Sequence, residues 1–285
     1  MQLKGNYSII NELISTIKHK NGGTMKRFIN DIKKYYKYTV YAAKAELNSE
    51  VAGSYLGWLW WFLEPLCFML VYAFMVMTIF RSSEQYMLAF VFIGNTIWTF
   101  FNKSLTTSVK LISLNKNIVT KVYIPKFILV LVKMCVNFFK LLVSLLIVAG
   151  LMLIYQVPLS LTMIQMIPIL VLVFLFTFGT CVIFSHFGVF VEDLSNVINI
   201  LLKLVFYFSG IFYSVSKRIP APYGKIMATI NPAAFFIEES RKVLLYGTNM
   251  NFIIYMIWLA ISIALCVIGI RLIYKNENTY VKVMS

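Results

Sequence analysis

The residues best placed to do chemistry are charged side chains inside otherwise apolar stretches. Lys126, Lys133 and Lys140 recur every seven residues, which places them on one face of a helix. Lys203 lies in a later apolar stretch. Ionisable groups at membrane depth are costly and mark paths for substrates or ions. Lys133 and Lys140 are therefore predicted to line a path for an anionic, phosphate-bearing cargo; the alternative is that these lysines snorkel to lipid headgroups.

A second candidate is the stretch GSYLGWLWWFLEPL at residues 53–66. A carboxylate and a proline, Glu64 and Pro65, interrupt an apolar segment that has only just begun. A proline frees backbone carbonyls, which are tolerated at membrane depth only beside protein or water. We therefore predict that Glu64 helps shape the cytoplasmic mouth of a channel. The alternative is a carboxylate that pairs with a neighbouring basic residue and anchors the helix.

Aromatic residues gather near the ends of the apolar stretches, first around residues 58–61 and again near residues 206–213. The candidates for a substrate path are Trp60, Trp61, Phe208, Phe212 and Tyr213. An interfacial belt explains such a cluster in most membrane proteins. The sharper interpretation is a series of aromatic faces along which sugar rings pass.

Common catalytic patterns are absent from the sequence. It contains no G-x-x-x-x-G-K-[ST] phosphate-binding loop, no H-E-x-x-H and no cysteine–histidine cluster. The four cysteines lie singly in apolar stretches. The carboxylates Glu192 and Asp193 are adjacent but have no partner base or nucleophile nearby in sequence. The sequence therefore predicts no catalytic residue, no metal site and no cofactor in this chain.

Composition indicates a polytopic helical membrane protein. Of the 285 residues, 60% are hydrophobic and only 13% are charged, about half the charged fraction of a soluble domain. The net charge of +15 would suggest nucleic acid for a soluble protein, but here the basic residues lie between apolar segments. An anionic inner leaflet is the expected partner.

Six spans of about 20 residues, the length that crosses a bilayer, are predicted. They lie near residues 59–80, 86–108, 127–155, 164–188, 196–215 and 251–274. Before them, apolar residues at three- and four-residue steps predict an amphipathic helix over 27–50 that lies on the membrane surface. Residues 1–25 are expected to be a disordered leader or to precede a physiological start at Met25. The basic segments before the first span, between spans two and three, and in the tail place both termini in the cytoplasm.

Residues 216–250 break the topological pattern, because they are basic yet six spans place them outside. Pro220 and Pro222 predict a turn, and Asn231-Pro232 divides the following helical pattern. Neither half is long enough to span. We predict two short re-entrant helices that line a protein-covered or wet space.

Several of these features occur in the order found in a known family. The sequence combines SYLGWLWWFLEPL, the loop NKNIVTKVYIPK at 115–126, a fifth span that ends in FYFSGIFYSVSKRIP, and INPAAFFIEESRKVLLYG. Over residues 26–280 this resembles the membrane subunit of type-2 ABC exporters for polysaccharides, which include permeases for O-antigen, capsule and teichoic acid.

The resemblance implies an interface helix over 26–57 and a transmembrane domain over 58–280. Within that domain it implies a coupling helix at 113–125, a second contact at 188–196 and outer gate helices at 217–246. The residues implied to contact an ATPase subunit are Asn115, Lys116, Lys121, Tyr123, Ile124, Pro125, Glu192 and Asp193. The family usually has a basic residue where this chain has Glu192. Pro220, Pro222, Asn231 and Pro232 fall in the implied outer gate.

The implied assembly is two permeases and two ATPases in the bacterial cytoplasmic membrane. ATP and Mg²⁺ would be bound by the partner subunits, and a lipid-linked glycan would pass between the permeases. Three alternatives remain open: a type-2 exporter of a lipid or drug, a glycan-modifying membrane enzyme, and a scaffold protein. An enzyme would need a polar catalytic cluster that the sequence does not display.

Overall fold

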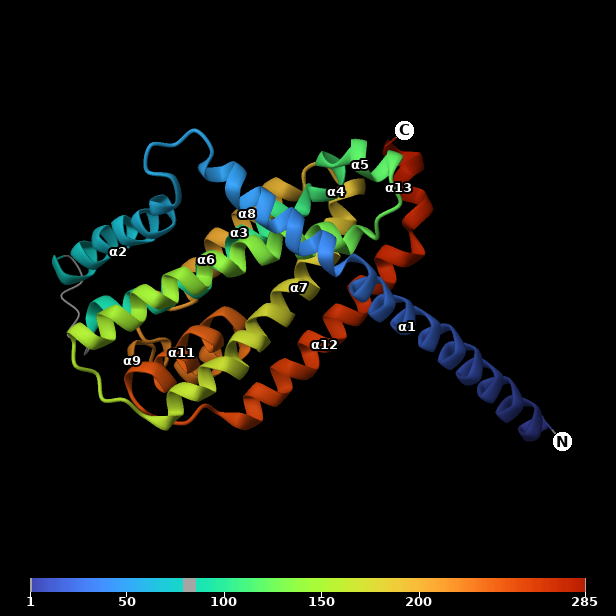
Figure 1. The fold of residues 1–285 in the computed structure, drawn as a ribbon. Helices are drawn as coiled ribbons and strands as arrows, with labels where there is room; N and C mark the ends of the chain where they lie inside the picture. Colours follow the sequence, from blue (N-terminus) through green and yellow to red (C-terminus); the bar gives the residue numbers. More distant parts are fainter. Residues whose placement is uncertain (1, 79–85, 285) are drawn as a thin grey trace.

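The computed structural model describes residues 2–78 and 86–284, and for residues 2–22 only the backbone. In these ranges the chain forms helices and turns and contains no strand (Figure 1). The predicted all-helical class is therefore confirmed. The predicted 81–85 loop and the last two residues of the first predicted span lie outside the described residues.

Three long helices form much of the body: α6 (Lys126–Ile154), α7 (Met166–Phe190) and α12 (Phe252–Lys275). α7 and α12 approach closely because Gly179 lies at their contact. A side-chain carbon at Gly179 would lie 2.8 Å from the backbone nitrogen of Cys266. Small residues permit such close helix packing in membranes. α3 (Met87–Val109) packs against both α6 and α7, and most of its N-terminal half is buried.

Helix α6, the continuous segment Leu161–Phe190 (η2, Leu161–Gln165, followed by α7) and α12 are long and apolar enough to cross a membrane. The segment Gly57–Val71, which includes η1 (Gly57–Leu59) and the start of α2 (Trp60–Thr78), is apolar but shorter. α8 (Leu194–Phe208) is also apolar and short. Each of the six predicted segments contains a helix, and their number as membrane spans stays a prediction.

The predicted end of the fifth segment was wrong. We expected it to run to residue 215, but α8 ends at Phe208 after 15 residues. Ser209 caps the helix and Gly210 follows with a φ of 66°, a left-handed conformation that commonly terminates helices. A 15-residue helix is about 22 Å long, whereas the hydrocarbon core is about 30 Å thick.

The N-terminal helix α1 (Gln2–Val51) contains the predicted interface helix and runs without a break through Met25. Figure 1 shows its first half extending away from the other helices and its second half crossing α6. Thr39 and Ala43 are buried on the side toward α6, whereas Tyr36 and Tyr41 are exposed. The predicted stripe thus contributes to the packing face of this helix, but Tyr36, which the sequence pattern places on the stripe, is exposed. The physiological start at Met25 stays a prediction.

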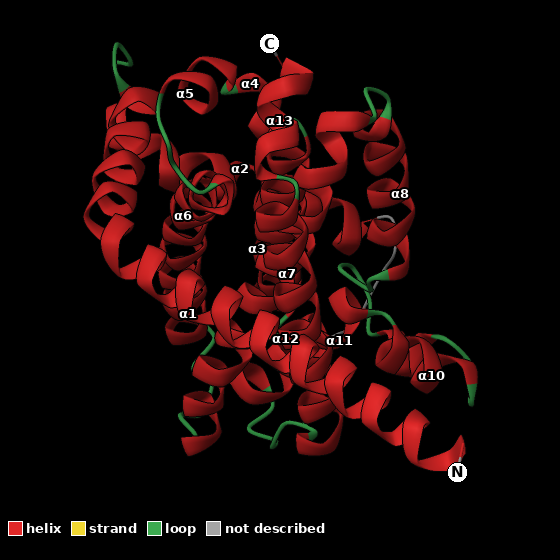
Figure 2. Ribbon diagram, turned by 90° about the vertical axis from the view of Figure 1, so that its right-hand side faces the viewer, coloured by secondary structure: helices red, strands yellow, loops and turns green. Residues whose placement is uncertain are grey.

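Short helices lie at the two ends of the long ones. Figure 2 shows α4 (Leu111–Leu114), α5 (Lys116–Lys121) and α13 (Glu277–Met284) together at one end. α10 (Tyr223–Ile230) and α11 (Pro232–Leu245) lie toward the other end, next to α9 (Val215–Arg218). The predicted division at Asn231-Pro232 is confirmed as a boundary between two helices, while its re-entry into a membrane stays a prediction.

Candidate functional site

A cavity of about 900 Å³ lies between α2, α3, α6 and α8 and opens to the surroundings. Its wall combines amides, charged groups and aromatic rings, which is the chemistry of a site that orients a polar ligand. These lining residues are Asn95, Asn102, Asn137 and Asn199; Glu64, Lys103, Lys140 and Lys203; and Trp61, Phe68, Trp98, Phe100, Phe206 and Tyr207.

Helix α3 supplies a polar stripe to this wall. Asn95, Thr99, Asn102, Lys103 and Thr106 follow one another at steps of four, three, one and three residues, so they share one helix face. The Thr106 hydroxyl donates to the Asn102 carbonyl at 2.8 Å, so it is satisfied within the helix. The amides and the ammonium group are left to face the cavity. This stripe makes α3 less apolar than α6, α7 and α12.

Glu64 also faces the cavity, where Lys103 Nζ lies 2.8 Å from its carboxylate. The side chains are 51% and 44% exposed, so water screens the pair. Pro65 lies inside α2 and leaves a backbone carbonyl of the preceding turn without its helical donor. The two sequence interpretations of Glu64 are therefore not exclusive, since this carboxylate both lines a cavity and pairs with a basic residue.

Two polar groups in the cavity wall are buried without a hydrogen-bond partner in the described part of the chain. They are the Trp61 indole N–H and the Thr96 hydroxyl, and both residues line the cavity. The Trp61 ring is held edge-on against Phe139, with ring centroids 5.2 Å apart. Buried polar groups are nearly always paired, so these two are exceptions in the cavity wall. Because both atoms are buried, a polar molecule in the cavity reaches them only when neighbouring side chains move.

The face of α6 that carries Lys133 and Lys140 packs against the second half of α1. Lys133 pairs with Glu46, and Lys140 Nζ lies 2.6 Å from a carboxylate oxygen of Glu50. Lys126, the first of the three, is only 2% exposed. Lys133 and Lys140, which are seven residues apart, thus both lie where α1 crosses α6. Of the two predicted path lysines, Lys140 lines the cavity and Lys133 does not.

Of the three lysines that line the cavity, Lys203 on α8 is the one without a paired carboxylate in the described part of the chain. Over residues 2–78 and 86–284, no carboxylate oxygen lies within 4.0 Å of its ammonium group, yet the side chain lines the cavity. Lys103 and Lys140 are each paired with a glutamate. The cationic character of the cavity is therefore concentrated at Lys203.

The other predicted path residues lie outside the cavity wall. The Trp60 indole donates to the Ser54 hydroxyl at 2.9 Å, just before α2. Tyr213 donates to the Tyr207 carbonyl at 2.9 Å, and Phe212 packs edge-on against Phe206 at 5.6 Å. Phe208 is exposed at the end of α8. Apart from Trp60, these aromatic residues lie at the end of α8 and in the turn that follows it. They are next to Phe206 and Tyr207, which line the cavity.

The predicted coupling residues divide into two groups. Lys116, Lys121 and Tyr123 are exposed on α5 and just after it, whereas Ile124 and Pro125 are buried. Asn115 joins α4 to α5 and donates to the Leu111 carbonyl at 2.8 Å. The exposed group is accessible to a partner, and the buried pair leads directly into α6.

The second predicted contact, Glu192 and Asp193, is exposed in the turn between α7 and α8. The Asp193 side chain makes no capping bond to α8. Both carboxylates therefore face solvent in this chain and are accessible to a partner.

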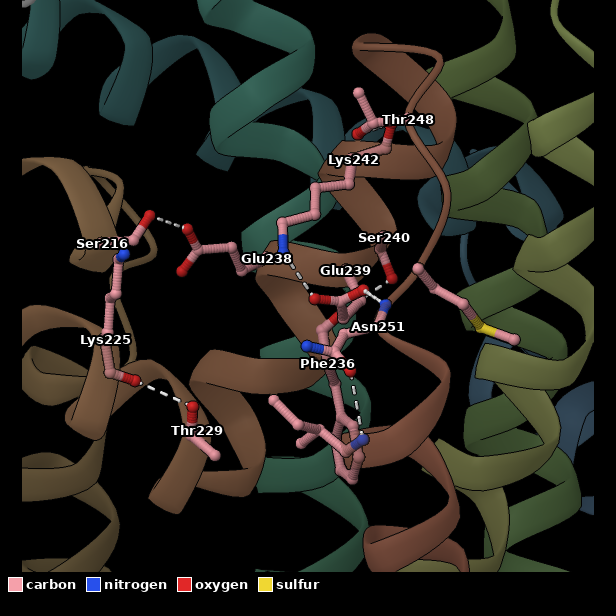
Figure 3. Close-up of polar contacts among 12 residues, drawn as sticks. Ser216, Lys225, Thr229, Phe236, Glu238, Glu239, Ser240, Lys242, Thr248 and Asn251 are labelled. Atoms are coloured by element: carbon pink, nitrogen blue, oxygen red, sulfur yellow. Dashed lines mark hydrogen bonds and ion pairs between the residues drawn. The ribbon is translucent and has the colours of Figure 1, made fainter.

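The predicted outer gate is a network of polar contacts (Figure 3). Asn231 accepts hydrogen bonds from the Ala233 and Ala234 amides, which caps α11, and donates to the Phe208 carbonyl at 3.1 Å. Pro232 occupies the first turn of α11, where its missing N–H costs nothing. Pro220 and Pro222 lie in the turn between α9 and α10.

Two consecutive glutamates of α11 connect it to its neighbours in Figure 3. Glu238 accepts from the Ser216 hydroxyl of α9. Glu239 is 3% exposed, pairs with Lys242 at 2.7 Å and accepts from the Asn251 amide at 2.7 Å, just before α12. The loop between α11 and α12 is thereby fixed to α11.

Arg241 is the most buried arginine of this network, at 3% exposed. Its guanidinium donates to the carbonyls of Phe90 at 3.0 Å, Gly210 at 2.8 Å and Ile211 at 2.6 Å. It also lies 3.5 Å from the centroid of the Phe90 ring. One side chain thus joins α11 to the start of α3 and to the turn that ends α8.

Residues 41–245 match the family described as ABC-2 type transporter, and this range contains the cavity, the coupling segment and α11. The chain belongs to the ABC-2 type transporter family. As an ABC-2 membrane subunit it is a transport protein, and the family implies an ATP-binding partner and a membrane context.

Two named relatives are similar over most of their length. The O-antigen export system permease protein RfbA of Klebsiella pneumoniae is 27% identical over 240 residues, or 84% of this chain and 92% of that protein. The O-antigen export system permease protein RfbA of Myxococcus xanthus is 28% identical over 221 residues, or 77% and 84% of the two chains. The resemblance predicted from sequence motifs is confirmed at the level of the family.

Sequence reasoning missed the amides of the cavity, the partner of Glu64, and Arg241. The α3 stripe was detectable, because Asn95, Asn102 and Lys103 have helical spacing in an otherwise apolar segment. Asn137 and Asn199 are single amides in their helices. Nothing in the sequence pairs them with α3, because their proximity depends on how α6 and α8 pack.

Proposed function

We propose that this chain is the permease subunit of an ATP-driven exporter of a lipid-linked polysaccharide, such as an O-antigen, capsule or teichoic-acid-type polymer. The cavity between α2, α3, α6 and α8 forms one wall of the polymer path. The observation that carries the proposal is the cavity wall itself, where four amides, charged side chains and aromatic rings line one open space. The names of the similar permeases support the same class of cargo.

Each kind of wall residue has a role with a glycan. Asparagine side chains donate to and accept from sugar hydroxyls, and one amide serves either purpose. Aromatic rings such as Trp61 and Tyr207 offer flat apolar faces to sugar rings and polar edges to water. Lys203, without a counter-charge nearby, provides the attraction for a phosphate group at the lipid-linked end. Lys140 remains close to the same space but is held by Glu50.

A second copy of the chain completes the path in this proposal. The outward surfaces of α2 and α8 flank the cavity and expose large apolar side chains, among them Leu70, Phe74, Ile200 and Leu204. These surfaces face lipid in a single chain, whereas in a homodimer two cavities would face each other across the seam. Two ATP-binding subunits would then hold the nucleotide and Mg²⁺.

The orientation follows from the short helices. α4, α5 and α13 lie at one end, and we propose that this end faces the cytoplasm together with both termini. The opposite end, with α10 and α11, would form the outer gate. The chain would then cross the cytoplasmic membrane of a bacterium six times.

The proposal is tested in cells that normally make this protein, by depleting it and following the surface polymer. After depletion, we expect polymer attached to its lipid carrier to accumulate inside the cell. In a separate experiment the permease is purified from undepleted cells, and we expect a co-purifying protein with a phosphate-binding loop at one copy per permease. Normal surface polymer after complete depletion would contradict the proposed function. A chain that purifies without an ATPase, even after cross-linking, would contradict the assembly.

A further inference from the structure

A cluster of polar contacts outside the cavity joins three segments that are far apart in the sequence. The Arg27 guanidinium of α1 lies 2.8 Å from a Glu277 carboxylate oxygen of α13, and the same nitrogen donates to the Tyr123 hydroxyl just after α5. Arg27 thus contacts both the segment that follows the coupling helix and the C-terminal helix. Both Arg27 and Glu277 lie outside the range 41–245 that matches the family.

Further contacts fix the same three segments. The Tyr274 hydroxyl at the end of α12 donates to Asp31 of α1 at 2.6 Å, and the Tyr274 ring lies 4.3 Å from the Arg27 guanidinium carbon. Tyr35 of α1 donates to the Tyr123 carbonyl at 3.1 Å. Tyr123 is therefore held to α1 through both its backbone and its side chain.

The C-terminal helix is itself anchored to a long helix. Tyr280 of α13 is fully buried, and its hydroxyl lies 2.6 Å from His186 Nδ1 on α7. Its ring packs near that of Phe190 at 6.0 Å. A displacement of α13 would therefore also displace α7. It would displace α12 as well, because α13 follows α12 almost without a break.

Charge and burial stabilise this arrangement. The Glu277 side chain is 14% exposed and Arg27 is 43% exposed, so water only partly screens the pair. Burial and the neighbouring Glu277 carboxylate raise the pKa of Tyr123, so its hydroxyl stays protonated at neutral pH. Tyr123 is therefore a neutral hydrogen-bond partner of Arg27 at neutral pH.

We propose that Arg27 and Glu277 are positioning residues through which movement of the coupling segment reaches α12 and α7. The coupling segment has a direct route to α6, because Pro125 caps that helix. The cluster adds a second route, from Tyr123 through Arg27 and Glu277 to α13. A displacement of α5 would then move α6 directly and would move α7 and α12 through α13. This inference rests on the proposed ATP-driven function, because the push comes from the ATP-binding partner.

The test compares Glu277→Gln with Glu46→Gln in the full chain, co-expressed with its ATP-binding partner and reconstituted in vesicles. Each change removes the carboxylate of one ion pair between α1 and another helix. Glu277 pairs with Arg27 beside the coupling segment, whereas Glu46 pairs with Lys133 of α6, away from it. Polymer exported and ATP hydrolysed are measured on the same sample. Arg27→Lys is the conservative variant that keeps the charge, and Arg27→Gln removes it.

For Glu277→Gln and Arg27→Gln we expect polymer exported per ATP to fall by about fivefold to tenfold, with ATP hydrolysis within about twofold of wild type. Arg27→Lys should recover much of the loss, and Glu46→Gln should leave the ratio unchanged. An unchanged ratio in Glu277→Gln would overturn the inference, and so would a parallel loss of both activities together with the assembled complex. If wild type itself neither exports polymer nor hydrolyses ATP, the proposed function fails before the variants are compared.

Discussion

The cavity and the α11 network both place charged groups among apolar helices, but they treat these groups differently. In the cavity, Glu64 and Lys103 are half-exposed, Lys203 has no carboxylate nearby in the described structure, and two buried polar groups lack partners. In the α11 network, Glu239 and Arg241 are almost fully buried. Arg241 donates to three carbonyls of neighbouring segments, and Glu239 pairs with Lys242 and accepts from the Asn251 backbone amide.

This difference distinguishes two uses of charge. A buried charge costs free energy unless it is fully paired, so Arg241 and Glu239 are explained by the segments they hold together. Charged and polar groups around an open space retain unused bonding capacity, which is what a passing polar molecule requires. Changes in the first region should therefore affect folding, and changes in the second should affect transport.

The largest effect is expected for Arg241→Leu. The substitution leaves the carbonyls of Phe90, Gly210 and Ile211 without their donor, at about 1–3 kcal/mol for each group that stays unpaired. The folded fraction after detergent extraction should fall sharply at all temperatures, as measured by size-exclusion chromatography after heating. The matched control is Arg218→Leu, because Arg218 is exposed. Equal stability of the two variants would remove the distinction between the regions.

A large effect on transport alone is expected for Lys203→Gln. Loss of the cation should lower polymer export about tenfold, equivalent to about 1.4 kcal/mol of interaction with an anionic group. Thermal stability should stay unchanged because Lys203 is exposed. Lys203→Arg should retain export, and Lys225→Gln, a neutralisation on the exposed surface of α10, serves as the control. Full export by Lys203→Gln would place the anionic group elsewhere.

A moderate effect is expected for Trp61→Phe, which keeps an aromatic ring but removes the unpartnered N–H. Export should fall about threefold, because side-chain movement that admits the polymer would expose this buried N–H, and one hydrogen bond contributes about 0.5–1.5 kcal/mol. Trp60→Phe is the matched control, since the Trp60 indole donates to Ser54 outside the cavity. If the two variants export equally well in the same complementation assay, the Trp61 donor has no role in the path.

The smallest effect on stability is expected at the Glu64–Lys103 pair. Exposed ion pairs contribute about 0–1 kcal/mol, so Glu64→Gln and Lys103→Met should change thermal stability very little. A double-mutant cycle on unfolding should give a coupling energy below about 1 kcal/mol. A coupling of several kcal/mol would show that this pair resembles the α11 network rather than a screened pair in an open cavity.

The comparison also shows what the sequence alone could predict. Apolar runs located the helices to within a few residues, because each run must be buried in protein or lipid. The end of α8 was misplaced, because apolar composition continues past Phe208 while Ser209 and Gly210 end the helix. A helix terminus depends on local backbone conformation, which hydropathy does not record.

The candidate site was predicted less completely. Glu64, Trp61 and Lys140 were found because charged or aromatic residues in an apolar run are conspicuous. Lys133 was grouped with Lys140 by spacing, yet it pairs with Glu46 of α1. The sequence contains the period of a helix but not the identity of the helix that packs against it. The same limit hid Arg241, whose acceptors lie about 30 and 150 residues away in the chain.

The central claim is that the polymer passes along the cavity wall, and photo-cross-linking tests it most directly. A photoreactive phenylalanine analogue is placed at Tyr207, in the cavity wall, and separately at Ile257, an exposed residue of α12 away from the cavity. Cells that synthesise the polymer are then irradiated and the permease is probed for attached glycan. We predict glycan on the Tyr207 variant and none on the Ile257 variant. Glycan on the Ile257 variant alone, or on neither while both variants still export, would contradict the account.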